Sequence, residues 1–158
     1  MESLPSSKLP RMTIQRQVLV QECGADASTA NKNDATPVFI AAKNGHTGTV
    51  RTLEQECGAD ASTAKNDGTT PVFTAAENGH TGTVLALVQE CGSDTSTANK
   101  NCTTPSMVAL AKGNWDAASC LLTELKADVR ACNLAGDSCL HYAAVAPSKT
   151  EQEGDQAI

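Results

Sequence analysis

Two histidines that occur in the same local sequence are the first candidates for a metal site. His46 and His80 each follow an Asn-Gly pair and lie 34 residues apart. Zinc ligands must converge to about 2.0–2.3 Å from one ion, whereas equal positions in successive layers of a repeat lie roughly 10 Å apart, the spacing of packed helices. We therefore predict that both imidazoles bind turn carbonyls between layers, and that the chain holds no metal and no other cofactor.

A serine and a histidine raise the question of nucleophilic catalysis. Ser138 lies three residues before His141, and Asp137 is the nearest acid. A hydrolytic triad also needs an aligned acid and an oxyanion hole, for which one neighbouring aspartate is thin support. Phosphate-binding glycine loops, HExxH pairs and kinase motifs are absent from the sequence. We predict that Ser138 is the structural hydroxyl partner of His141 and that the chain has no catalytic residues.

The seven cysteines favour free thiols over a disulfide framework. Their number is odd and no Cys-x-x-Cys pair occurs. Cys23, Cys57 and Cys91 share the 34-residue interval, which places them too far apart for a disulfide, whose Cα atoms lie within about 7 Å. We expect these three in buried packing. Cys102 should be exposed at a hairpin tip, as an incidental surface thiol, with a redox-sensitive or contact residue as the alternative.

Trp115 is the sole tryptophan and opens an expected helix, at the position that Thr47 and Thr81 hold in earlier copies. Tryptophan is enriched among interface hot spots, so this residue is a candidate anchor for a partner. Partial burial against a neighbouring layer is the interpretation that we favour.

A 34-residue internal repeat must position all these residues. Pro37, Pro71 and Pro105 keep this interval, and the segments Thr36–Asn66 and Thr70–Lys100 are identical at 22 of 31 aligned positions. Self-similarity with a period of 20–50 residues is typical of solenoids.

Each unit is expected to fold as helix, turn, helix and loop. Residues 67–71 supply turn chemistry and a proline for the first helical turn, and Asn78-Gly79 ends that helix. Val84 and Leu87 recur at helical spacing in a second helix, which Gly92 ends. Both helices are too short to be stable alone, so each unit must bury its apolar face against its neighbours.

These motifs resemble a known family. TPVFIAAKNGH at 36–46 and TPVFTAAENGH at 70–80 resemble the TPLHxAAxxGH pattern of ankyrin repeats, and Cys57-Gly58-Ala59-Asp60 resembles the Gly-Ala-Asp loop of that family. Residues 138–144 match the pattern again. The resemblance covers about residues 15 to 146. It implies an all-α ankyrin-repeat solenoid of stacked helix-turn-helix units with hairpin-like loops.

The chain departs from the family pattern in three respects. Ankyrin units usually have 33 residues, so one extra residue precedes the Gly-Ala-Asp loop, and we expect a slightly longer helix end there. Lys126 stands where Gly58 and Gly92 stand in earlier copies, at a cost of about 1 kcal/mol if the left-handed conformation is kept. Gly48 and Gly82 fall inside second helices at a similar cost. We expect a modest stability.

The repeats at the two ends are incomplete. Pro5 and Pro10 stand where a first helix would lie, and the polar run after Pro147 cannot supply an apolar second helix. A solenoid without polar-faced caps exposes its last interfaces. The expected order is an irregular segment over 1–14, a partial repeat with a second helix over 15–32, ankyrin repeats over 33–66, 67–100 and 101–134, a partial repeat with a first helix over 135–146, and a polar, disordered tail over 147–158.

The resemblance implies a concave partner-binding face, made of hairpin tips and the exposed side of the first helices. Positions 43 and 77 differ between near-identical copies, as positions freed from packing would. Lys43 and Glu77 carry opposite charges, so the face has no single-sign field. The predicted partner-binding residues are Asn33, Lys43, Asn44, Asp67, Thr69, Glu77, Asn78, Asn101, Thr103 and Lys112, with Ala35 and Ala111 beside them.

Composition limits the class of partner. A formal net charge of -6 argues against binding a phosphate backbone. No apolar run reaches the roughly 18–20 residues that span a bilayer, and residues 1–10 lack a signal-peptide core. We predict a non-catalytic scaffold or adaptor, cytoplasmic or nuclear, that binds another protein and neither nucleic acid, membrane nor a small-molecule substrate. The alternative is a regulatory or targeting segment of a larger multidomain enzyme or channel.

Overall fold

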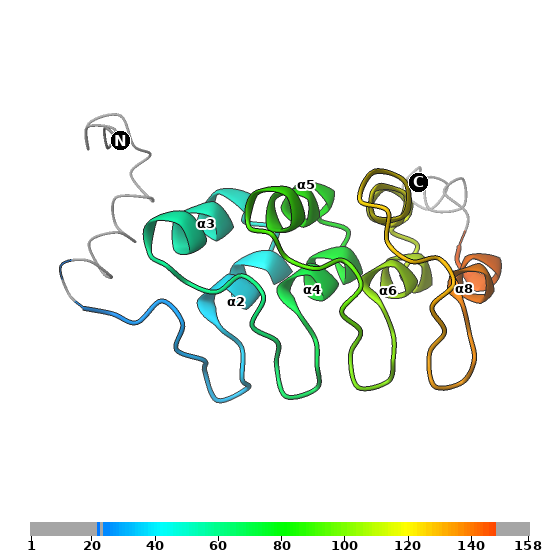
Figure 1. Ribbon diagram of the computed structural model, residues 1–158, viewed down its shortest axis with the longest axis horizontal. Helices are drawn as coiled ribbons and strands as arrows, with labels where there is room; N and C mark the ends of the chain where they lie inside the picture. The colour runs from blue at the N-terminus through cyan, green and yellow to red at the C-terminus, as the bar shows by residue number, and fades with distance from the viewer. Residues whose placement is uncertain (1–21, 23, 148–158) are drawn as a thin grey trace, which may run out of the picture.

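The computed structural model describes Glu22 and residues 24–147; residues 1–21, 23 and 148–158 lie outside this description. Two rows of short helices run along the described chain (Figure 1). One row holds the first helices, α2 (Pro37–Lys43), α4 (Pro71–Glu77), α6 (Pro105–Ala111) and α8 (Cys139–Val145). Hairpin loops extend from the first helices, away from the other row (Figure 1).

The other row holds the second helices, each an α-helix that continues as a π-helix. They are α3 (Thr47–Arg51) with η3 (Thr52–Glu56), α5 (Thr81–Leu85) with η4 (Ala86–Glu90), and α7 (Trp115–Ser119) with η5 (Cys120–Glu124). The described residues contain one isolated β-bridge, between Cys132 and Ser138, and no strand. The predicted all-α solenoid is therefore confirmed. No helix in the described part of the chain has the length and apolar character needed to cross a bilayer.

The first helices start and end where the sequence predicts. The Thr36 hydroxyl accepts a hydrogen bond from the Phe39 amide at 3.2 Å, and the caps at Thr70 and Thr104 repeat this bond. Proline follows each cap at the first helical position, where no amide hydrogen bond is lost. Past α2, Gly45 lies at φ +70°, which glycine adopts without steric cost.

The extra residue of each repeat is accommodated in the π-helical half of the second helix. The Cys57 amide donates to the Thr52 carbonyl, five residues earlier, at 3.2 Å, and Cys91 donates to Ala86 in the same way at 3.1 Å. A π turn closes over one residue more than an α turn. The inserted residue thus widens the last turn of the helix, where we expected a simple lengthening.

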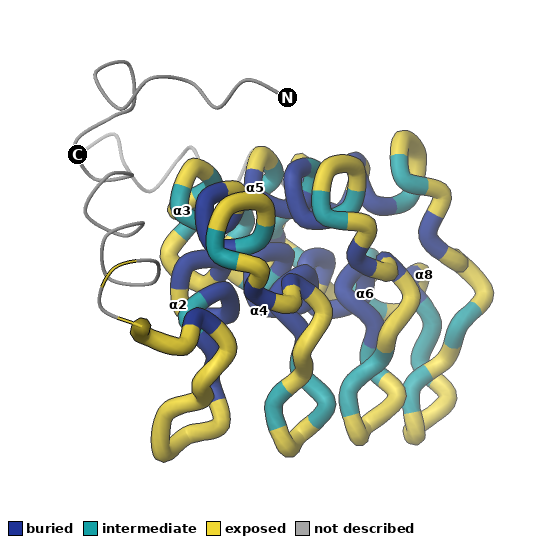
Figure 2. Tube along the Cα trace, turned by 60° about the vertical axis from the view of Figure 1, so that its left-hand side comes forward, coloured by how far each residue is buried: buried dark blue, intermediate teal, exposed yellow. Residues whose placement is uncertain are grey.

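The core is one continuous cluster that runs through all the layers. The second helices contribute side chains that are fully buried, Val50, Val84, Leu87 and Leu121. The first helices contribute alanine pairs such as Ala75-Ala76, whose small side chains let neighbouring helices approach closely. Buried segments recur in every layer, between exposed hairpin tips and exposed outer turns (Figure 2).

Polar side chains also join consecutive second helices. The hydroxyl oxygens of Thr47 and Thr83 lie 2.7 Å apart, and Arg51 donates two hydrogen bonds of 2.6 Å to Glu90. The Arg51 hydrogen bonds lower the pKa of Glu90. Because both charged side chains are exposed, this ion pair orients the helices more than it stabilises them.

Lys126 gives a direct test of backbone strain. It has φ +53°, at the position where Gly92 has φ +70°. We predict that Lys126→Gly raises the free energy of unfolding by about 1 kcal/mol, because this conformation is costly for a residue with a Cβ atom. Urea unfolding followed by circular dichroism measures the change. The matched variant Gly92→Ala should lower the free energy of unfolding by a similar amount, and unchanged stability in both variants would contradict the assignment.

Candidate functional site

The hairpin tips and the first helices enclose a polar groove of about 500 Å³, which we call the tip groove. Its walls come from the hairpins around residues 65–69 and 99–103 and from α2, α4, α6 and α8. It therefore spans four consecutive layers on the hairpin side of the stack. The lining residues are Phe39, Lys43, Lys65, Asp67, Thr69, Phe73, Thr74, Glu77, Asn99, Thr103, Val108, Ala111, Lys112 and Tyr142.

The tip groove brings together six of the ten residues predicted to bind a partner. They come from three repeats, because stacking places equal positions of neighbouring layers side by side. All six are exposed or half-buried. The six residues are Lys43, Asp67, Thr69, Glu77, Thr103 and Lys112.

Charges of both signs alternate along the tip groove. The Lys65 ammonium lies 3.7 Å from the Asp67 carboxylate, and the Lys112 ammonium lies 3.7 Å from the Glu77 carboxylate. Lys43 makes no ion pair within the residues that the structure describes. Its ammonium group is therefore available to an acidic group of a partner.

Hydrogen bonds keep the Asp67 carboxylate charged. The side chain and the amide of Thr69 both hydrogen-bond to it, the amide at 2.9 Å. These bonds lower the pKa of Asp67, and the nearby Lys65 ammonium lowers it further. Asp67 thus presents a fixed negative charge at the hairpin tip near neutral pH.

Lys65 is a groove residue that the sequence prediction missed. Its ammonium lies 5.4 Å from the centre of the Phe39 ring, within cation–π range. The equal positions in the other repeats are Asn31, Asn99 and Asn133, whose side-chain oxygens accept hydrogen bonds from hairpin amides. The replacement of this turn asparagine by lysine in one repeat was the signal that could have identified it.

Aromatic residues complete the groove and were also missed. Phe39 and Phe73 line it and are only 6% and 5% exposed. Tyr142 lines the groove from α8, and its hydroxyl accepts a hydrogen bond of 2.8 Å from the Asn133 amide group. Tyr142 holds the repeat position that Ile40, Thr74 and Val108 hold in earlier copies. The change to an aromatic residue was the only sequence signal that could have identified it as a groove residue.

Two predicted residues serve the helix ends. Asn44 and Asn78 do not line the tip groove. The side-chain amide of each donates a hydrogen bond of 2.8 Å to the carbonyl four residues earlier in its own helix. Each carbonyl also accepts the backbone amide of the same asparagine at 3.2 Å, so the side chain adds a second hydrogen bond at the helix end.

The outermost tip residues also lie apart from the tip groove. Asn33 and Asn101 are exposed but do not line it. The neighbouring Ala35, predicted beside Asn33, is buried with 5% exposed. That prediction is wrong, because Ala35 belongs to the stem of the hairpin, where its carbonyl accepts a bond of 3.0 Å from the Asn31 amide.

The turn histidine links layers as predicted. The His80 ring donates from Nε2 to the Lys43 carbonyl of the preceding repeat at 3.1 Å. One repeat later, Asn114 donates to the equivalent Glu77 carbonyl at 2.7 Å. For His46 the corresponding partner is residue 9, which lies outside the described residues. Among the described residues no three His, Cys, Asp or Glu side chains are grouped to hold a metal ion.

The serine–histidine pair caps a helix. His141 Nδ1 lies 3.1 Å from the Ser138 amide and 3.0 Å from its hydroxyl, in a capping box at the start of α8. Asp137 accepts instead from the Asn133 side chain at 3.3 Å. The predicted partnership of Ser138 and His141 is confirmed, and the acid does not extend it into a triad.

The described cysteines are all free thiols, with differing exposure. Cys102 is exposed, as expected, at φ +57°. Cys57 and Cys91 pack against the core, as expected, but are only half-buried, because they follow π-helical segments at its rim. Burial raises the pKa of Cys91 to about 11, and the neighbouring Glu54 and Glu90 carboxylates contribute. Cys23 lies outside the described residues.

Trp115 is half-buried against the core cluster, which agrees with the interpretation that we favoured. Its indole nitrogen donates a hydrogen bond of 2.8 Å to the Pro147 carbonyl. The ring also lines an apolar groove at the C-terminal end of the stack. Trp115 therefore lines this apolar groove and does not line the polar tip groove.

Comparison with protein families identifies the repeat independently of the structure. A family model of three ankyrin repeats matches residues 13–99, more than half of the chain. Comparison with curated proteins finds no significant match.

The bond between layers can be tested at His80. We predict that His80→Ala lowers the free energy of unfolding by about 1 kcal/mol, because it leaves the Lys43 carbonyl without its donor. His80→Asn should retain most of the stability, since Asn114 makes the same bond in the next repeat. Urea unfolding of the three proteins measures both effects, and equal losses in the two variants would argue against the bond.

Thiol reactivity should follow exposure and pKa. At pH 7.5 we predict that iodoacetamide alkylates Cys102 at least about tenfold faster than Cys91, because only the thiolate reacts and the raised pKa of Cys91 leaves little thiolate. Peptide mass spectrometry after timed quenching gives both rates from one sample. Similar rates would show that the end of η4 opens readily in solution.

Proposed function

The chain belongs to the ankyrin repeat family, whose members are generally protein–protein interaction modules, and from this premise we propose that it is a non-catalytic scaffold or adaptor. In this proposal the tip groove holds a segment of a partner protein. The alternative role, a regulatory or targeting segment of a larger enzyme or channel, would use the same groove. An experiment on the groove therefore tests binding in either setting.

One observation carries the proposal: the fold does not require a particular charge at the position that Lys43 and Glu77 share. Lys43 and Glu77 occupy equal positions of near-identical repeats and have opposite charges. Both helices end in the same way, so the fold tolerates either residue. Side chains that the fold does not need for packing, and whose charges lie at fixed positions, can recognise a specific partner.

The groove chemistry supports a partner segment of mixed charge. Lys43 offers a free ammonium group, while Asp67 offers a carboxylate with a lowered pKa. The aromatic rings of Phe39 and Phe73 support an apolar side chain between the charged groups. Such a groove would bind more weakly as salt is raised, because its exposed charges are screened.

The proposed compartment is the cytoplasm or the nucleus. Six cysteines of the described chain are unpaired, among them the exposed Cys102 and Cys132. Free surface thiols persist in a reducing compartment. This supports the location that we propose.

Charge reversal at Lys43 tests the proposal. Proximity labelling in the native cell supplies candidate partners, and each candidate is then titrated against the purified chain. We predict that Lys43→Glu weakens binding at least about fivefold, since it repels an acidic group at the groove. The circular dichroism spectrum should not change, because glutamate is the residue that the next repeat has at this position.

Lys32→Glu is the matched control. Lys32 is also exposed and carries the same charge, but it does not line the tip groove. Binding should therefore survive in this variant. Equal weakening by both reversals would indicate a general charge effect, and binding that is lost only in unfolded variants would remove support for the groove.

A further inference from the structure

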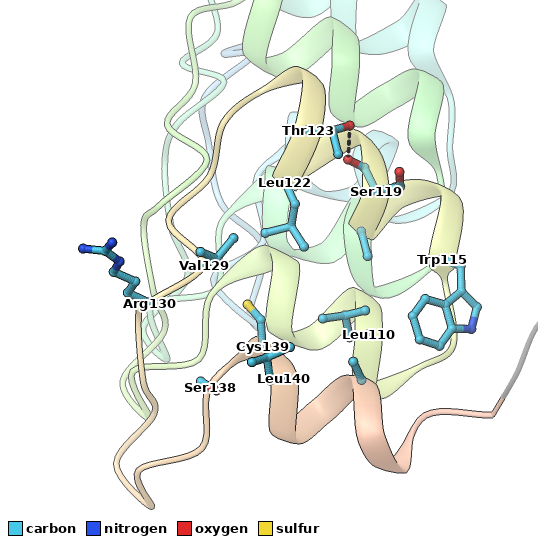
Figure 3. A pocket seen from close by; sticks show the side chains of 12 residues that line it. Leu110, Trp115, Ser119, Leu122, Thr123, Val129, Arg130, Ser138, Cys139 and Leu140 are labelled. Carbon is cyan, nitrogen blue, oxygen red and sulfur yellow. Dashed lines mark hydrogen bonds between the residues drawn. The ribbon is translucent and has the colours of Figure 1, made fainter.

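An apolar groove of about 730 Å³, which we call the end groove, lies at the C-terminal end of the described stack. Trp115 and Leu122 line it from α7 and η5, and Leu140 lines it from α8 (Figure 3). Val129 lies between them on the connecting loop (Figure 3). Leu140 is 79% exposed and Val129 is 53% exposed, so apolar surface of two elements faces solvent.

The inner repeats bury the same positions. Leu140 follows Val38, Val72 and Ser106 in the repeat register, and these residues are 0%, 1% and 0% exposed. Val129 follows Ala27, Ala61 and Thr95, which are all buried. The end groove is therefore the stacking surface of the solenoid at a place where the described chain does not cover it.

The inner repeats also show what covers this surface. Val72 lines a small space together with Ser93 and Asp94, residues of the loop that follows the second helix of the same repeat. The Ser93 hydroxyl donates to the Ala61 carbonyl of the preceding loop at 3.2 Å. The occupant that fits the end groove is thus a second helix followed by its Gly-Ala-Asp loop.

The residues after α8 do not have this character. Three polar residues, Glu151, Gln152 and Asp155, hold the repeat positions of Ala117, Ala118 and Leu121. Those three residues are buried, with 1%, 1% and 0% of their surface exposed. Burying these polar side chains without partners would be costly. The tail is therefore a poor occupant.

The segment from residue 13 to residue 29 does have this character. Val18 and Leu19 hold the repeat positions of the buried Cys120 and Leu121, where the tail has Gly154 and Asp155. Gln15 and Arg16 are polar at the positions of Ala117 and Ala118, as the tail residues are, so the apolar match of this segment rests on Val18 and Leu19. Pro5 and Pro10 stand where its own first helix would lie.

The loop of this segment is exposed where its counterparts are buried. Ala25 is exposed, whereas the equivalent Ala59, Ser93 and Ala127 are 4%, 5% and 6% exposed. Ser93 lines the same small space as Val72. The exposed pair Ala25 and Leu140 is therefore the pair that meets inside an inner repeat.

Within one chain these two surfaces cannot meet. Residues 24–29 lie at the opposite end of the stack from α8 (Figure 1). We propose that copies of this protein stack head to tail, with residues 13–29 of one copy filling the end groove of the next and completing the repeat that α8 begins. This interface is separate from the tip groove and does not depend on the proposed function.

A head-to-tail interface joins two different surfaces, so each added copy leaves one of each free. Such heterologous contacts form open stacks unless a rotation closes them. The inner layers of this solenoid follow one another in a row (Figure 1). The stacks are therefore expected to lengthen as the protein concentration rises.

Sedimentation velocity on the full chain tests this arrangement. We expect species larger than a dimer that grow with concentration. Leu140→Glu blocks one surface and Ala25→Glu blocks the other, and each should raise the dissociation constant at least about tenfold, because a charge enters an apolar contact. Both residues are exposed in the single copy, so both variants should keep the circular dichroism spectrum of the parent.

Mixing the two variants gives the decisive result. Each retains the surface that the other lacks, so an equimolar mixture should form a one-to-one dimer and nothing larger. Val145→Glu is the matched control, since Val145 is also 79% exposed on α8 but holds the repeat position of Lys43, Glu77 and Ala111, which line the tip groove. A parent that is monomeric at all concentrations, a mixture that stays monomeric, or equal loss of assembly with Val145→Glu would overturn the proposal.

Discussion

Contact between one repeat and the next is the constraint on which the rest of this structure depends. Each first helix has seven residues, and each second helix has five α-helical and five π-helical residues. Helices of this length are marginal in water. Their apolar faces, with Leu87 and Leu121 fully buried, are covered only because another layer lies against them. Stability is therefore a nearest-neighbour property, and a change in one layer weakens the two that touch it.

The same constraint decides which polar groups are free. His80, Asn114 and the threonine caps hold turns and neighbouring layers together, so their hydrogen bonds belong to the fold. Lys43 on the outer side of α2 makes no ion pair among the described residues, whereas Asp67 also accepts hydrogen bonds from Thr69 in its own hairpin. The tip groove collects these residues from several layers, which makes it a surface whose chemistry can change while the stack stays intact.

Much of the fold could be predicted from residue patterns because the signals are local. Thr70 and Pro71 start a helix and Asn78-Gly79 ends it, whatever surrounds them. The residues that line the tip groove were harder to predict from the sequence, because the groove is formed by side chains from different layers. Lys65 reaches the ring of Phe39, 26 positions away in sequence. The period of the repeat places the two residues in adjacent layers but does not show that they meet.

Other differences from expectation also have physical reasons. The family resemblance placed Asn44 and Asn78 on a binding face, and the structure shows that their side-chain amides bond to helix-end carbonyls. The burial of Cys57 depends on how the last helical turn closes. A 34-residue period indicates an inserted residue, but whether it lengthens the helix or widens a turn depends on backbone hydrogen bonds that the pattern does not specify.

The near-identity of two successive repeats has a consequence for the history of the chain. DNA that encodes such similar segments is prone to unequal recombination, which removes or adds one whole period. Because the break points fall at equal positions, the new joint has the same caps and turns as the old ones and most of the same buried side chains. The number of layers can therefore change by one in a single genetic event, while the surfaces that meet between layers change little.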